Sequence, residues 1–60
     1  MKPNDFRHKR ETLELTQTQL AVELGVRYQT ISRYETGLVL IPKMAELALL
    51  YLESIKWKGK

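Results

Sequence analysis

The sequence predicts an all-α fold in which residues 1–60 form one compact domain of four helices. Apolar residues recur at steps of three and four in several short segments, which is the spacing of a helix with one buried face. Gly25 and Gly37 stand where two of these segments should end. The chain has no cysteine and a single histidine, so neither a disulfide nor the usual zinc ligand set can stabilise it. Helix packing must therefore supply the stability of this small chain.

The first helix is expected over about residues 4–14, after Pro3 and with Asn4 as its N-cap. Its inward face reads Phe6, Arg10 and Leu13. A charged side chain on an inward face needs a partner, because an unpaired buried charge is costly. Arg10 is therefore expected to form an ion pair with another helix.

The second helix is expected over residues 17–24. Thr16 and Gln19 have the spacing of a capping box, in which the side chain of each residue bonds the backbone N–H of the other. Gly25 favours an end to the helix, since glycine adopts the left-handed backbone conformation of a C-terminal cap without strain. The apolar side of this helix reads Leu20, Ala21 and Leu24. A helix this short is marginal in water, so tertiary packing must hold it.

The third helix is expected over residues 28–36, with Gly37 as its C-terminal cap. It should bury Ile31 and Tyr34. Glu35 follows Ile31 by four residues and so lies close to the same inward face. We therefore expect Glu35 to be the partner of Arg10, in a partly buried ion pair that ties the first helix to the third.

The fourth helix is expected over residues 42–55, with Pro42 in its first turn. Its polar residues form one narrow stripe, which comprises Lys43, Glu46, Glu53 and Lys56. Apolar residues cover most of the remaining circumference, namely Met44, Leu47, Ala48, Leu49, Tyr51, Leu52 and Ile55. One small core cannot cover that much apolar surface, so part of it should stay exposed on a monomer.

The charge, the apolar runs and the histidine and cysteine content of the chain favour some classes of function and argue against others. Ten Lys and Arg residues against seven Asp and Glu give a net charge of +3, which fits an anionic partner without requiring one. Residues 1–10 hold no apolar run of a secretory signal, and the longest apolar stretch, residues 47–52, is too short to span a membrane. We therefore expect a cytoplasmic protein with no membrane partner. One histidine and no cysteine offer no catalytic constellation, so neither an enzyme nor a metal or cofactor is expected.

Residues 17–36 have the pattern that a helix-turn-helix requires. Ala21 allows two helices to approach closely, Gly25 makes the turn, and apolar residues fix the pair to the other helices. Those apolar residues are Leu20, Leu24, Val26, Ile31 and Tyr34. The stretches TQTQLAVELGV and YQTISRYETG resemble the two central helices of the lambda-repressor-like, Cro-type helix-turn-helix family, and the resemblance covers roughly residues 4–52. It implies that the third helix enters the DNA major groove while the start of the second rests on the phosphate backbone.

The outward face of the third helix can be worked out from its own residues. If Ile31 and Tyr34 point inward, then the side chains that project outward are Tyr28, Gln29, Ser32 and Arg33. Gln29 matches the donor and acceptor of adenine in the major groove, and Arg33 suits either guanine or a phosphate. Tyr28 suits a thymine methyl through its ring or a phosphate through its hydroxyl. The alternative is that these are ordinary solvated side chains, with Arg33 no more than a surface charge.

Phosphate contacts are expected at the edges of this face. Gln17, in the first turn of the second helix, can add its amide to the backbone N–H groups there, and Arg27 adds a charge. The family resemblance adds Arg10 and Lys43 as phosphate contacts. For Arg10 the structural pairing with Glu35 is the preferred interpretation.

The segment after Gly37 departs from the family pattern. Apolar residues, Leu38, Val39, Leu40 and Ile41, replace the polar or basic residues that are common there, and the chain has little room for a fifth helix. Together with the fourth helix and Trp57 they would form an apolar patch too large for a small monomer to expose. We expect a homodimer through this region, on a near-palindromic double-stranded DNA operator. The alternative is that the segment folds back over the fourth helix in a monomer.

Two functions from different classes fit these features. The first is a sequence-specific DNA-binding transcriptional regulator, with repression as its expected action. The second is a protein-interaction module on a helix-turn-helix scaffold, such as an antitoxin or an accessory regulator. Residues 16–37 carry only two cations, Arg27 and Arg33, against two acids, which keeps this alternative open.

Overall fold

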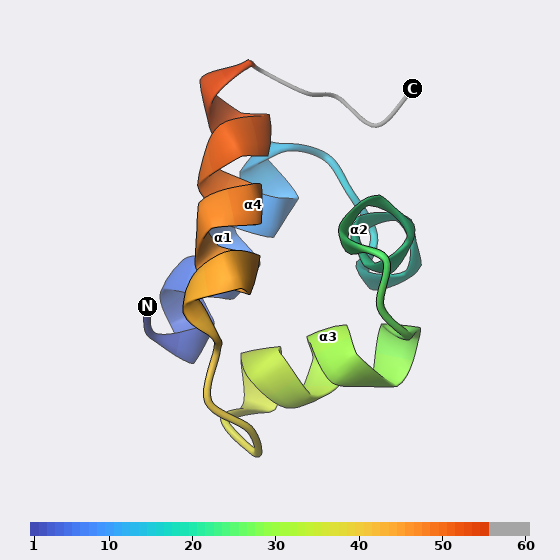
Figure 1. Cartoon of the computed structure of the whole chain (residues 1–60), viewed down its shortest axis with the longest axis vertical. Coiled ribbons are helices and arrows are strands. Elements are labelled where there is room, and N and C mark those ends of the chain that lie inside the picture. The colour runs from blue at the N-terminus through green and yellow to red at the C-terminus, as the bar shows by residue number, and fades with distance from the viewer. Residues whose placement is uncertain (56–60) are drawn as a thin grey trace.

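The computed structural model describes residues 1–55 and contains four helices (Figure 1). They are α1 (Pro3–Thr12), α2 (Gln17–Leu24), α3 (Tyr28–Thr36) and α4 (Lys43–Ser54). The expected all-α fold class is confirmed. In Figure 1, α3 runs across the foot of the molecule while α4 rises beside α1 and α2 is viewed almost end-on. Trp57, assigned above to the dimer interface, lies outside the described residues.

Each helix contributes one fully buried large side chain to a single core. These four side chains are Phe6, Leu20, Ile31 and Leu49. The remaining buried residues surround them and comprise Leu13, Leu15, Ala21, Tyr34, Ala45 and Leu52. The rings of Phe6 and Tyr34 meet edge to face with centroids 5.6 Å apart, an arrangement worth about 0.5–1.5 kcal/mol beyond the buried area. This contact fixes α3 against α1.

The start of α1 differs from the sequence expectation. The helix begins at Pro3, and the N-cap is Lys2, whose backbone is extended and whose side chain makes no capping hydrogen bond. Asn4 is therefore inside the helix and not its cap. Proline suits the first helical position because it lacks the N–H that would be unpaired there and its φ is already helical.

The end of α1 also comes earlier than expected, at Thr12 and not at residue 14. The chain turns through Leu13 and Glu14, and Glu14 has a φ of 61°, in the left-handed region that glycine usually occupies. This turn brings Leu15 into the core, where it is buried. Because no glycine marks the turn, the end of the helix was predicted two residues too late.

At α4, Pro42 is the N-cap with an extended backbone, so the helix begins one residue later than expected and ends at Ser54. One side of α4 is held by two ion pairs, one from α1 and one from the amino group of the first residue. Lys9 Nζ lies 2.9 Å from Glu53 Oε1, and the amino group of Met1 lies 3.4 Å from Glu46 Oε1. Within residues 1–55, no helix combines the length and apolar character needed to cross a lipid bilayer.

Candidate nucleic-acid interface

The corner between α2 and α3 is built by local signals in the sequence. Gln19 donates its backbone N–H to Thr16 Oγ1 at 3.0 Å, and Thr16 donates its N–H to Gln19 Oε1 at 2.9 Å. Gly25 then closes α2 with a φ of 72°, which a residue with a side chain rarely adopts. Both ends of α2 are thus fixed by the chain's own capping groups. The short helix is held at a defined angle to the helix that follows.

The orientation of α3 is set by its two buried side chains, Ile31 and Tyr34. On the opposite side, Tyr28, Gln29 and Arg33 are exposed, and Ser32 is half-buried. The side chains that the sequence placed on the outward face therefore point away from the core. Within residues 1–55, no segment of the chain covers Gln29 or Arg33.

An exposed cation stands at the start of α3 and another at the start of α4. Arg27 is the N-cap of α3, but its side chain makes no capping hydrogen bond to the helix. Lys43 is the first residue of α4 and is exposed. Val26, which the sequence assigned to the buried apolar set, is 37% exposed in the turn before Arg27. Its place in the turn, beyond the end of α2, keeps it from packing fully into the core.

Behind this face, Arg10 and Glu35 form a bidentate ion pair. Arg10 Nε lies 2.6 Å from Glu35 Oε2, and Arg10 Nη2 lies 3.1 Å from Oε1. The third guanidinium nitrogen, Nη1, donates to the carbonyl oxygen of Leu15 at 2.8 Å. Only 11% of the Arg10 side chain and 4% of the Glu35 side chain are exposed. The pair therefore joins α1 to α3 and also fixes the turn that follows α1.

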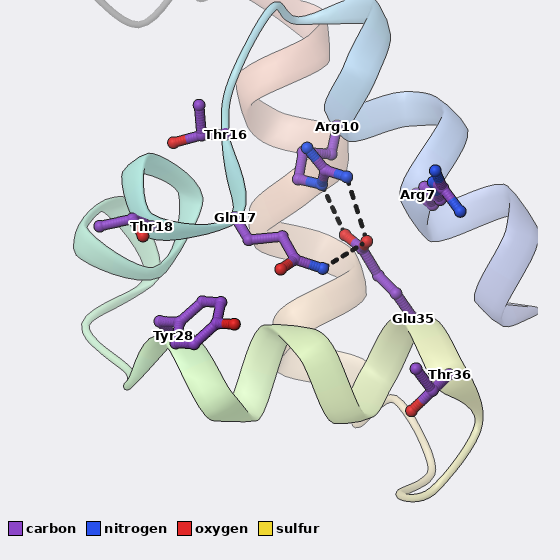
Figure 2. Close-up of a pocket in the computed structure, with 8 residues that line it drawn as sticks. All are labelled: Arg7, Arg10, Thr16, Gln17, Thr18, Tyr28, Glu35 and Thr36. Carbon is purple, nitrogen blue, oxygen red and sulfur yellow. Dashed lines mark hydrogen bonds and ion pairs between the residues drawn. The ribbon is translucent and has the colours of Figure 1, made fainter.

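Gln17 joins the same network. Its Nε2 donates to Glu35 Oε1 at 3.0 Å, so one carboxylate receives hydrogen bonds from α1 and from α2 (Figure 2). The amide of glutamine carries two N–H groups, and one remains for another acceptor. The position of Gln17 at the start of α2 was predicted but this contact was not, because sequence spacing does not show which side chains of three converging helices meet.

An open hollow of about 560 Å³ lies over this network, between α1, the start of α2 and α3 (Figure 2). It is lined by Arg7, Arg10, Thr16, Gln17, Thr18, Tyr28, Glu35 and Thr36. The first turn of a helix leaves backbone N–H groups without partners inside the helix, and α2 begins here. The same hollow is lined by threonines, by the amide of Gln17, by Tyr28 and by two arginines, together with the Glu35 carboxylate. The lining can donate hydrogen bonds to an anion.

A second, apolar surface lies in the loop after α3 and along α4. In the loop after α3, Leu38 is 77% exposed and Leu40 is 91% exposed. The outer side of α4 continues it with Met44, Leu47, Tyr51 and Ile55, at helical steps of three, four and four. Val39 is also exposed, whereas Ile41 packs partly against the core. The loop does not bury its leucines against α4.

Comparison with known proteins places this geometry in a family. Residues 6–50, which are more than half of the chain, match the helix-turn-helix family model. No curated protein and no solved structure gives a significant match. The chain belongs to the lambda-repressor-like helix-turn-helix family of DNA-binding regulators.

Proposed function

We propose that this protein is a sequence-specific transcriptional regulator, a repressor, that binds double-stranded DNA as a homodimer with α3 in the major groove. The observation that carries the proposal is the outward face of α3, where polar side chains stand opposite the buried Ile31 and Tyr34. A helix held from behind in this way presents hydrogen-bonding groups in a fixed arrangement, which base recognition requires. Repression needs only occupation of the operator, so it is the simplest consequence of this binding.

Base recognition is assigned to Tyr28, Gln29, Ser32 and Arg33. Gln29 offers a carbonyl and an amide that fit the N6 and N7 edge of adenine, while Arg33 fits the two acceptors of guanine. Tyr28 places its ring at the start of α3, where it can meet a thymine methyl. Ser32, half-buried between them, has the shortest reach, and its hydroxyl can donate one hydrogen bond as well as accept.

Phosphate contacts are assigned to Gln17, Arg27 and Lys43. Gln17 keeps one N–H after donating to Glu35, and it lies at the start of α2 beside the hollow. The exposed Arg27 and Lys43 add positive charge at the starts of α3 and α4. Three of the five N–H groups of Arg10 donate within the protein and its side chain is only 11% exposed, so we assign Arg10 a structural role.

The apolar surface supports the homodimer. Seven exposed apolar side chains lie in the loop after α3 and along α4: Leu38, Val39, Leu40, Met44, Leu47, Tyr51 and Ile55. If each contributes on the order of 100 Å², the patch approaches the ~800 Å² per partner of a stable interface. A second copy offers the same patch and so provides a matching apolar partner. Two-fold dimers of this kind place their reading helices about 34 Å apart, so the operator should be nearly palindromic.

Binding to random duplex DNA across a salt series tests the DNA-binding proposal. Phosphate contacts release counterions, so log K should fall linearly and steeply with log salt. The apolar outer side of α4 favours the second candidate function, a protein-interaction module, which should show no such slope. Absence of salt-dependent binding would therefore refute the DNA-binding assignment and favour that module.

A further inference from the structure

We propose that Glu35 withholds Arg10 from DNA and so lowers the affinity of the protein for duplex DNA of any sequence. This inference rests on the proposed DNA-binding function. In this role Glu35 is a positioning residue that acts through Arg10. It does not itself touch a base.

The geometry of Arg10 is the first support. Its Nε and Nη2 bind the two oxygens of Glu35, and its Nη1 binds the Leu15 carbonyl, so each guanidinium nitrogen has a partner inside the protein. Its side chain is 11% exposed. Three of its five N–H groups are thus used inside the protein, and the low exposure of the side chain leaves the other two little access to a phosphate.

The position of the pair is the second support. Arg10 and Glu35 line the same hollow as Thr16, Gln17 and Tyr28, which the proposed function places beside the DNA backbone (Figure 2). A cation at that place would attract phosphate, and a carboxylate would repel it. Because the two charges are about 3 Å apart, their fields largely cancel toward a phosphate outside the pair.

The consequence concerns overall affinity. Attraction between cations and phosphates does not depend on sequence, so it strengthens binding to every duplex and adds nothing to base selection. Neutralising one cation at the backbone-facing hollow therefore weakens binding to operator and random duplexes alike while leaving the contacts of Gln29 unchanged. Base contacts then supply a larger share of the binding free energy.

The pair of Lys9 and Glu53 provides a matched control. It is also an ion pair between helices, with Nζ and Oε1 2.9 Å apart, but neither residue lines the hollow. Glu35→Gln and Glu53→Gln raise the net charge by the same amount. A difference between the two variants must therefore arise from where the charge is removed.

The test is the slope of log K against log salt on random duplex DNA, measured for variants shown by circular dichroism to be folded. For Glu35→Gln we expect the slope to steepen by up to about 0.9, which corresponds to one additional phosphate contact, and the affinities for operator and random duplexes to rise by a similar factor. Glu53→Gln should change the slope much less. An unchanged slope in folded Glu35→Gln overturns the inference.

A second variant tests the inference even if Glu35→Gln does not fold. Arg10→Met/Glu35→Leu removes both charges, and exchange of a buried ion pair for apolar residues is often neutral or stabilising. If Glu35 withholds Arg10, this double variant should keep the wild-type slope. A slope that is less steep than the wild-type slope by about 0.9 would mean that Arg10 contacts phosphate in the wild type. That result would overturn the inference. Wild-type protein without any salt slope would instead refute the proposed function.

Discussion

The outward faces of α3 and α4 differ in chemistry although the two helices are anchored in the same way. Each has one side buried in the common core, through Ile31 and Tyr34 in α3 and through Leu49 in α4. The opposite side of α3 is polar, with Gln29 and Arg33 exposed, whereas α4 exposes a line of apolar side chains. One small core thus supports two surfaces, one suited to base edges and the other suited to protein.

The two helices are also tied to α1 by different ion pairs. The Arg10–Glu35 pair that holds α3 is nearly buried, at 11% and 4% exposure, and Gln17 bonds the same carboxylate. The Lys9–Glu53 pair that holds α4 is 29% and 39% exposed. Water competes with the second pair far more than with the first, so the two pairs should contribute unequally to stability.

The largest expected effect comes from removing one partner of the buried pair. Glu35→Ala leaves the Arg10 guanidinium buried without its carboxylate and should cost about 3–5 kcal/mol in free energy of unfolding. This approaches the whole stability expected of a domain of this size. Glu53→Ala, the control, should cost less than about 1 kcal/mol. Urea unfolding of both variants measures the difference, and equal losses would show that burial does not separate the two pairs.

The next effect concerns the apolar surface. Leu38→Glu/Leu40→Glu places two charges where we propose that a second copy packs, and it should weaken dimerisation by about 2 kcal/mol or more if these leucines lie near the interface centre. Val22→Glu, on an exposed site of α2, is the control and should leave dimerisation unchanged. Sedimentation near micromolar concentration measures both. A wild-type protein that is strictly monomeric contradicts the dimer.

A smaller effect is expected on the reading face. Gln29→Ala should cost about 1–3 kcal/mol of operator affinity and relax selectivity at one base pair of each half-site, because it removes a two-bond contact to a base. Gln17→Ala should instead weaken binding to all sequences alike. Titration against single-base operator variants measures both, and equal losses on every variant for Gln29→Ala would remove that residue from base recognition.

The smallest effect is at the start of α2. Thr16→Ala removes the hydroxyl that accepts the Gln19 N–H and should cost about 1 kcal/mol, which lowers the Tm of a domain of this size by roughly 4–8 °C. Thr18→Ala removes an exposed hydroxyl in the same turn that is not part of the capping box, so it should lower the Tm by much less. Thermal unfolding followed by circular dichroism measures both variants. Equal shifts would indicate that the capping box adds no stability.

The elements that carry local signals could be predicted from the sequence. The capping box at Thr16 and the caps Gly25 and Gly37 set the bounds of α2 and α3, and the observed bounds match those expected. The turn after α1 carries no such signal, since Glu14 and not a glycine adopts the left-handed conformation. The burial of Leu15 follows from that turn and was missed for the same reason.

Long-range contacts were predicted only where helical spacing pointed to them. Arg10 and Glu35 each fall on an inward face, so their pairing followed from two independent patterns. Glu53 lies on the polar stripe of α4, and nothing in the spacing shows that this stripe faces Lys9, 44 residues earlier. The bond from Gln17 to Glu35 likewise depends on how three helices converge.

Selection of bound sequences from a random duplex pool tests most directly whether the outward face of α3 reads bases. Wild-type protein should enrich one motif with two-fold symmetry, and Gln29→Ala should return the same motif with one position relaxed in each half. A pool that stays random, or a Gln29→Ala motif identical to that of the wild type, would contradict the account.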